Sequence, residues 1–165
     1  MDVTAALKSQ YHAALAMLGQ VIRQCPEDLW HSEVDGDPFW QVVYHALFYG
    51  HLYLMPDEAS FQTWEHHREE YQFLEALPWP PHDPPKLGEP YTKEQTLDYW
   101  EIVDGLVDAT LAKVDLSAEK CGFGWYDMPK LEHEILSIRH LQHHTSRLGG
   151  FLRLGTGKGV DWVGS

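Results

Sequence analysis

Cysteine is scarce in this 165-residue chain, which contains only Cys25 and Cys121. Two cysteines are too few for a disulfide framework, so we expect both to be free thiols with a structural role. Basic residues are also few, since 12 Lys and Arg stand against 25 Asp and Glu and give a formal net charge of -13. Because this charge repels a phosphate backbone and no local basic cluster offsets it, nucleic acid is not expected as a direct partner.

Long apolar runs are absent as well. No stretch of about 18 uninterrupted apolar residues occurs, and the N-terminal residues are not a basic leader followed by an apolar segment. We therefore expect a cytoplasmic protein without a membrane partner. The chain does contain 44% hydrophobic and 13% aromatic residues, including seven Trp and eight Tyr. At this length, that content predicts one folded domain with a sizeable core.

Hydrophobic periodicity predicts two long helices in the first third of the chain. Apolar residues between 2 and 25 share one helical face, and Pro26 ends this pattern and begins a turn. A second helix should follow Asp37, which we expect to cap its free amides while Pro38 occupies the first turn. The run from 39 to 55 is apolar on nearly every side, which is typical of a helix buried between others.

Two further helices are predicted after a long connection. The connection passes through a stretch in which five prolines fall between Pro78 and Pro85, and it covers roughly 35 residues. A capping box of Thr92 and Gln95 should start the third helix, and the fourth should run from 130 to about 154. The fold class is therefore all-α, a four-helix bundle with a long proline-rich crossover between its second and third helices. It forms one domain over 1–154, followed by a tail over 155–165 that Trp162 could anchor.

The histidines of the second and fourth helices are the candidate site. At 100° per residue, His140 and His144 share the inner face of the fourth helix, whereas His143 falls on a charged arc. In the second helix, His45 and His51 lie about 120° apart, so both cannot point at one metal. From the residues alone two interpretations stay open: a histidine site for a divalent metal, or buried imidazoles that hydrogen-bond within a polar pocket.

The segments FWQVVYHALFYGHLYL and RHLQHHTSRLGG resemble the DinB-like superfamily of four-helix bundles. This superfamily includes relatives of bacillithiol transferases and of mycothiol-dependent maleylpyruvate isomerase. In it, one histidine of the second helix and an HxxxH pair of the fourth bind a divalent metal, commonly nickel or zinc. When the ligand positions are carried over by motif, the resemblance implies that His45, His140 and His144 are the metal ligands.

One part of the fourth-helix motif departs from the family. Many members read HxxxHRGQ, whereas Thr145, Ser146 and Arg147 follow the second ligand here. In an alternative alignment with the family motif, His143 would stand at the position of the first ligand and Arg147 at the position of the second. The metal site would then not form, because arginine would replace a histidine ligand. The helical projection favours the register with His140 and His144.

The resemblance implies a catalytic function for such a site, because three protein ligands leave a position open on the metal. We expect a homodimeric, metal-dependent transferase that acts on a small molecule, with a low-molecular-weight thiol as cosubstrate. The alternatives are a metal-dependent hydrolase and a non-catalytic metal-binding or dimeric interaction protein of the same fold.

Residues that could assist the metal are only weakly indicated. Tyr49 and Glu134 are candidates for a catalytic role, and Ser137 also lies near the inner arc of the fourth helix. Against this, Tyr49 could be a core residue, Ser137 a packing residue and Glu134 an exposed carboxylate of the first helical turn. Trp125 and Tyr126, just before the fourth helix, could form a lid or close one end of the core.

Overall fold

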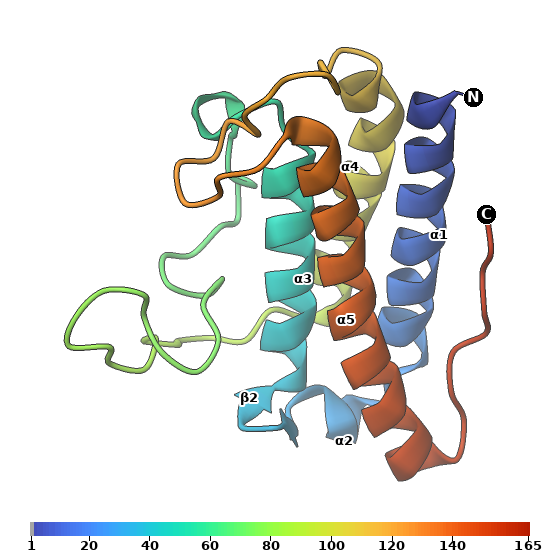
Figure 1. The fold of residues 1–165 in the computed structure, drawn as a ribbon. Helices are drawn as coiled ribbons and strands as arrows, with labels where there is room; N and C mark the ends of the chain where they lie inside the picture. The colour runs from blue at the N-terminus through green and yellow to red at the C-terminus, as the bar shows by residue number, and fades with distance from the viewer. Residues whose placement is uncertain (1) are drawn as a thin grey trace.

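The computed structural model describes residues 2–165, and its fold is all-α apart from one pair of two-residue strands (Figure 1). The four long helices are α1 (Val3–Gln24), α3 (Phe39–Leu54), α4 (Lys93–Leu111) and α5 (Lys130–Thr156). The short elements are α2 (Glu27–Trp30), the 3-10 helix η1 (Glu58–Ser60), β1 (Glu33–Val34) and β2 (Asp37–Pro38). The strands pair antiparallel, with Val34 opposite Asp37. The predicted all-α class is therefore confirmed.

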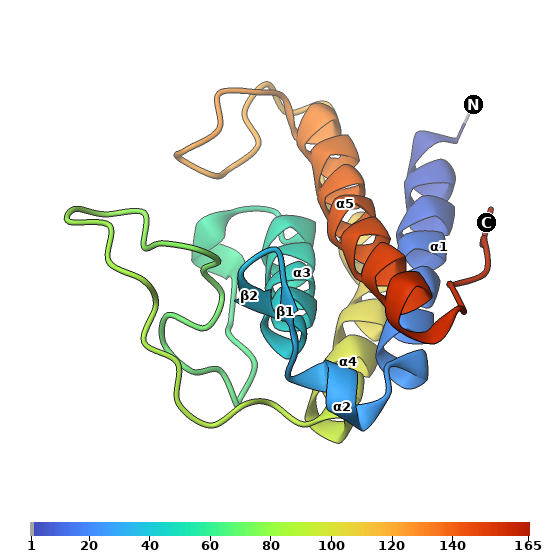
Figure 2. The ribbon, with the colours of Figure 1, turned by 90° about the horizontal axis from the view of Figure 1, so that it is seen from below.

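Each long helix packs against two others. Helices α4 and α5 both contact α1 on one side and α3 on the other, as the end-on view in Figure 2 also shows. Fully buried side chains from all four helices meet between them, for example Leu18, Leu47, Val107 and Leu148. The contact between α3 and α5 is close at Gly50, where a Cβ atom would lie 2.8 Å from the Leu141 side chain. This close approach brings the two histidine-bearing helices together.

Local signals explain where the helices begin, with one exception. Thr92 and Gln95 form the predicted capping box of α4, with hydrogen bonds of 3.0 and 3.2 Å. The prediction that Asp37 caps α3 is wrong, because Pro38 occupies the N-cap position and no side chain accepts a capping hydrogen bond there. Asp37 belongs to β2, and its carboxylate accepts hydrogen bonds from Arg147 and from the Glu75 amide instead. Pro26 ends the α1 pattern as predicted, but the following residues form the one-turn helix α2 rather than a turn.

Two long connections lie on the same side of the helices (Figures 1 and 2). The first joins α3 to α4 and contains η1 as its only helical piece among the described residues. Its backbone is tied to the core, since Gln41 donates to Phe73 O at 2.7 Å and Trp30 donates to Tyr91 O at 2.8 Å. The second joins α4 to α5. Both therefore stand beside α3, where they can wall a site on its surface.

The C-terminal residues run back along α1 (Figure 1). Helix α5 ends at Thr156, and the tail is held to α1 by a Gln10–Gly164 hydrogen bond and by two bonds between Gln20 and Asp161. The suggestion that Trp162 anchors this tail is wrong, because 79% of its surface is exposed.

Both cysteines are buried and neither forms a disulfide within residues 2–165. Over the same residues, no helix is long and apolar enough to cross a membrane.

Candidate metal centre

The structure brings together the three histidines that the sequence motif selects. His45 projects from α3, and His140 and His144 project from successive turns of α5. The Nε2 atom of His140 lies 3.1 Å from Nε2 of His45 and 3.2 Å from Nε2 of His144. One ring nitrogen from each residue can be chosen so that all three lie within 4.8 Å of one another. We call this group the histidine trio.

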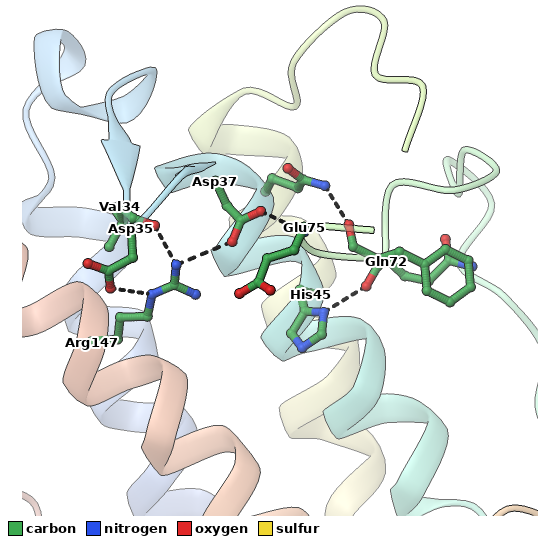
Figure 3. Close-up of polar contacts among 9 residues, drawn as sticks. Val34, Asp35, Asp37, His45, Gln72, Glu75 and Arg147 are labelled. Atoms are coloured by element: carbon green, nitrogen blue, oxygen red, sulfur yellow. Dashed lines mark hydrogen bonds and ion pairs between the residues drawn. The ribbon is translucent and has the colours of Figure 1, made fainter. Parts of the chain in front are cut away.

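The ring of His45 is held in a defined orientation. Its Nδ1–H donates to the backbone carbonyl of Gln72 at 2.7 Å (Figure 3), so Nε2 carries the free lone pair. This Nε2 is the atom that lies 3.1 Å from Nε2 of His140. A metal-binding histidine usually donates its second ring N–H in this way. His140 and His144 differ, since their Nδ1 atoms are buried without a hydrogen-bond partner in the described chain.

Burial keeps the trio neutral. Loss of solvent lowers the pKa of His45 to about 4, that of His140 to about 3 and that of His144 to about 2, and the nearby imidazoles lower the last two further. Near pH 7 all three rings are therefore uncharged, which is the form that binds a metal ion.

The donor set fits a divalent transition metal. Three neutral imidazole nitrogens suit zinc, nickel, copper or iron. In tetrahedral coordination with metal–nitrogen bonds of about 2.0 to 2.1 Å, two ligand nitrogens lie roughly 3.3 Å apart. The spacings of 3.1 and 3.2 Å in the trio are close to this value. The trio can therefore hold a metal ion, whereas its geometry does not identify which one.

The remaining predicted histidines stay outside the trio. His143 is exposed on α5, and His51 accepts or donates a 3.1 Å hydrogen bond with the Tyr99 hydroxyl on another face of α3. His66 is exposed, whereas His67 is partly buried. That ring is half-buried because its Nδ1 lies 2.6 Å from the Tyr44 hydroxyl.

His133 is a buried histidine that the sequence interpretation missed. It lies on α5 seven residues before His140, and both ring nitrogens lack a hydrogen-bond partner within residues 2–165. Its ring stacks on Phe123 with a centroid distance of 4.7 Å and lies 4.9 Å from Tyr53. Tyr53 in turn lies 6.1 Å from His140, so it stands next to both histidines. The spacing of seven residues, which is two helical turns, was the signal that could have revealed it.

The two candidates for a catalytic role occupy different environments. The ring of Tyr49 lies 4.7 Å from that of His45 and 5.6 Å from that of His140, and burial raises its pKa to about 12. Tyr49 thus lies beside the trio. The expectation that Glu134 is exposed is wrong, because its side chain is fully buried.

Glu134 belongs to a separate buried cluster at the start of α5. Its Oε1 lies 3.1 Å from Lys130 Nζ, and its Oε2 accepts a 2.5 Å hydrogen bond from the Tyr11 hydroxyl of α1. Burial raises the pKa of Glu134, although Lys130 and Tyr11 oppose this effect. Ser137 is also fully buried, and its hydroxyl has no partner in the part of the chain described. Neither residue joins the trio.

A cavity of about 770 Å³ opens beside His45 and His140. Aromatic side chains from α3 and from both long connections form most of its wall: Phe48, Tyr49, Tyr53, Phe61, Phe73, Trp79, Trp125 and Tyr126. Trp79 and Trp125 are each about half-exposed, at 49% and 51%, and so border both the cavity and the solvent. Of the two alternatives for Trp125 and Tyr126, this position favours a cover over the site.

A second, smaller hollow also reaches the trio. It has a volume of about 300 Å³ and is lined by His140 and Tyr126, which also line the cavity, together with Arg139, His143 and Leu136. His140 is therefore accessible from two sides, one aromatic and one bordered by a guanidinium group.

Arg147 braces the backbone of the segment before α3 and makes no hydrogen bond to the trio (Figure 3). Its Nε donates to Asp35 Oδ2 at 2.9 Å, and its Nη2 donates to Asp37 Oδ2 at 3.2 Å and to the Val34 carbonyl. Asp37 Oδ1 then accepts from the Glu75 amide at 2.9 Å. Arg147 thus leaves His45, His140 and His144 close together, and His143 does not join them.

Comparison of the chain with protein-family models, with curated proteins and with solved structures finds no match.

Proposed function

We propose that this chain is a DinB-like four-helix bundle that binds nickel or zinc through His45, His140 and His144 and serves as a metal-dependent transferase of small molecules. In this proposal α1, α3, α4 and α5 are the bundle, and residues 55–92 are its proline-rich crossover. The observation that carries it is the convergence of three neutral ring nitrogens beside a cavity large enough for a substrate.

The number of ligands supports a catalytic metal over a structural one. Structural zinc sites are closed by four protein ligands, whereas catalytic sites keep a position for water or substrate. A divalent metal held by the trio would supply Lewis-acid chemistry to a group in that position. The contribution of the chain is to orient His45 through Gln72, to keep the three rings neutral and to restrict water with the aromatic wall.

The two hollows favour a transferase over a hydrolase. A transfer reaction needs a donor and an acceptor at the same centre, and His140 borders both the aromatic cavity and the hollow at Arg139. A low-molecular-weight thiol that carries a carboxylate would find a cationic partner only in the smaller hollow. A hydrolase would need only one organic substrate and water.

Metal analysis of protein purified without a histidine tag tests the ligand set. We expect about one equivalent of nickel or zinc per chain, lost in His140→Ala and in His45→Ala because each removes one of three ligands. His143→Ala is the matched control, since this histidine lies on the same helix but outside the trio. If the purified protein binds neither nickel nor zinc, even after either metal is added back, the proposal is wrong.

Activity requires a second measurement. The metal-loaded protein is screened with several cellular thiols against small electrophiles, and thioether formation is followed by mass spectrometry. We expect turnover that disappears in the metal-free protein and in His140→Ala. Stoichiometric metal without any turnover would support the non-catalytic alternative.

A further inference from the structure

The wall of the aromatic cavity limits what can bind beside the trio. Eight of its fourteen lining residues are Phe, Tyr or Trp, and among residues 2–165 no Lys or Arg lines it. The single charged residue of the wall is Glu58, an exposed carboxylate at the edge. Large aromatic surfaces favour planar apolar ligands, which stack or pack edge-to-face against such rings.

Charge excludes an anion from this cavity more strongly than shape does. When no metal ion occupies the trio, a carboxylate or phosphate group would lose its hydration on entering and would find no cationic side chain there. It would also approach Glu58 within a chain of net charge -13. The ligand that fits is therefore neutral.

One buried polar atom of a residue that lines the cavity lacks a hydrogen-bond donor among residues 2–165. The side-chain Oε1 of Gln72 is buried without a partner in the described residues, although Gln72 lines the cavity. Its backbone is fixed, because the Gln72 carbonyl accepts the bond from His45 (Figure 3). A buried acceptor that lacks a partner costs free energy, and a ligand O–H or N–H group would remove this cost.

We infer that the cavity binds a neutral aromatic molecule with one hydrogen-bond donor, of the phenol or aromatic amine class, and holds it against His45 and His140. The donor bonds to Gln72, and the ring lies between the walls that carry Tyr49, Trp79 and Tyr126. That this molecule is the substrate of the metal centre rests on the proposed function, whereas its binding does not.

Two fluorescent probes with the same ring skeleton test the charge preference. N-phenyl-1-naphthylamine is neutral and has one N–H group, and 1-anilinonaphthalene-8-sulfonate adds a sulfonate. With the metal-free protein, we expect the neutral probe to bind at least ~10-fold more tightly, a difference of about 1.4 kcal/mol. Trp79→Ala should weaken binding of the neutral probe, whereas Trp162→Ala, which alters an exposed tail residue, should not. Equal affinity for both probes, or tighter binding of the sulfonate, would overturn the inference.

Competition with 2-naphthol and 2-methoxynaphthalene tests the donor. We expect 2-naphthol to displace the neutral probe at about tenfold lower concentration than its methyl ether, because only the naphthol can donate to Gln72. The preference should disappear in Gln72→Leu, which keeps the backbone carbonyl for His45. If the two competitors act equally on the unaltered protein, the cavity does not select a donor and the inference is wrong.

The His144→Ala variant separates this inference from the proposed function. His144 belongs to the trio but does not line the aromatic cavity, so the variant should lose metal and still bind the neutral probe. Metal uptake by the unaltered protein without probe binding would overturn the cavity inference alone. Probe binding without metal uptake would overturn the proposed function alone.

Discussion

Removal of the charge on Lys130 should make the stability of the protein strongly dependent on pH. Lys130 is the first residue of α5 and is 2% exposed, and its Nζ lies 3.1 Å from the fully buried carboxylate of Glu134. The same ammonium group donates to the Met55 carbonyl at 2.6 Å. In Lys130→Met the apolar stem is retained, but the Glu134 carboxylate loses its only close cation among the described residues.

The size of the effect follows from distance and burial. At 3.1 Å, two unit charges attract each other by about 5 kcal/mol at an effective dielectric constant of 20. Breaking a buried pair by removing one partner costs about 3 to 5 kcal/mol, because the other charge is left without compensation. Since a domain is stable by only about 5 to 15 kcal/mol in total, Lys130→Met should lose a large share of its stability at pH 7.

The sign of the pH dependence is set by Glu134. Burial already raises its pKa in the folded state, and Lys130 is the strongest opposing influence. Without Lys130 the folded pKa rises further, whereas the unfolded value stays near about 4.3. Between these two values the folded protein holds a proton that the unfolded chain releases, so stability falls as pH rises through this window. The deficit of Lys130→Met should therefore be small near pH 4 and complete above the raised pKa.

Urea unfolding followed by circular dichroism, at a series of pH values between 4 and 8, measures this deficit. The double variant Lys130→Met with Glu134→Gln should recover much of the loss at neutral pH, because no buried charge remains. Lys8→Met is the matched control, since Lys8 pairs with the exposed Asp108 at 3.4 Å. A deficit that is equal at every pH, or a double variant that is as unstable as the single one at pH 7, would refute the reasoning.

Two further predictions concern the supports of the site. Arg147→Met should weaken metal binding by about tenfold, measured by competition with a chelator, because it frees the segment that carries the Gln72 carbonyl; unchanged affinity would show that this brace does not reach His45. Gly122→Ala should lower stability by about 1 kcal/mol or more in thermal unfolding, since φ is +89° and the new Cβ would lie 2.7 Å from the Pro56 carbonyl oxygen. Gly124→Ala is its control, because no neighbouring atom of the described residues would lie within 4 Å of the new Cβ. Equal losses of stability in both variants would contradict the steric argument.

The sequence predicted the long helices and the shared inner face of His140 and His144 because both depend on local spacing, whereas His45 was implied by the resemblance to the DinB-like superfamily. Helical periodicity assigns a face to each residue of α5, and this was enough to select His140 and His144 and to reject His143. The capping box of Thr92 and Gln95 is also local, since both of its hydrogen bonds join residues three apart. Such features can be predicted without knowing which helices pack against each other.

The predictions that failed depend on a neighbour from elsewhere in the chain. Asp37 stands where a helix cap is expected, but its carboxylate instead accepts a hydrogen bond from Arg147, which is 110 residues away in the sequence. Glu134 looks like a solvated carboxylate of a first turn, yet α1 covers it and Tyr11 bonds to it across 123 residues. The role of Gln72 had no signal at all, because it lies in a connection without periodicity.

The residues that follow His144 on α5 have a structural consequence for α3, the helix that carries His45. Thr145 turns inward and its hydroxyl bonds to the Leu141 carbonyl of its own helix at 2.8 Å, whereas Arg147 reaches across to Asp37. Asp37 holds the amide of Glu75, three residues after the Gln72 carbonyl that orients His45 (Figure 3). Helices α3 and α5 are thus joined twice, directly at Gly50 and indirectly through Arg147. A substitution at Arg147 can therefore change the orientation of His45 although no hydrogen bond joins the two side chains, so a residue that follows His144 on α5 helps to position His45 on α3.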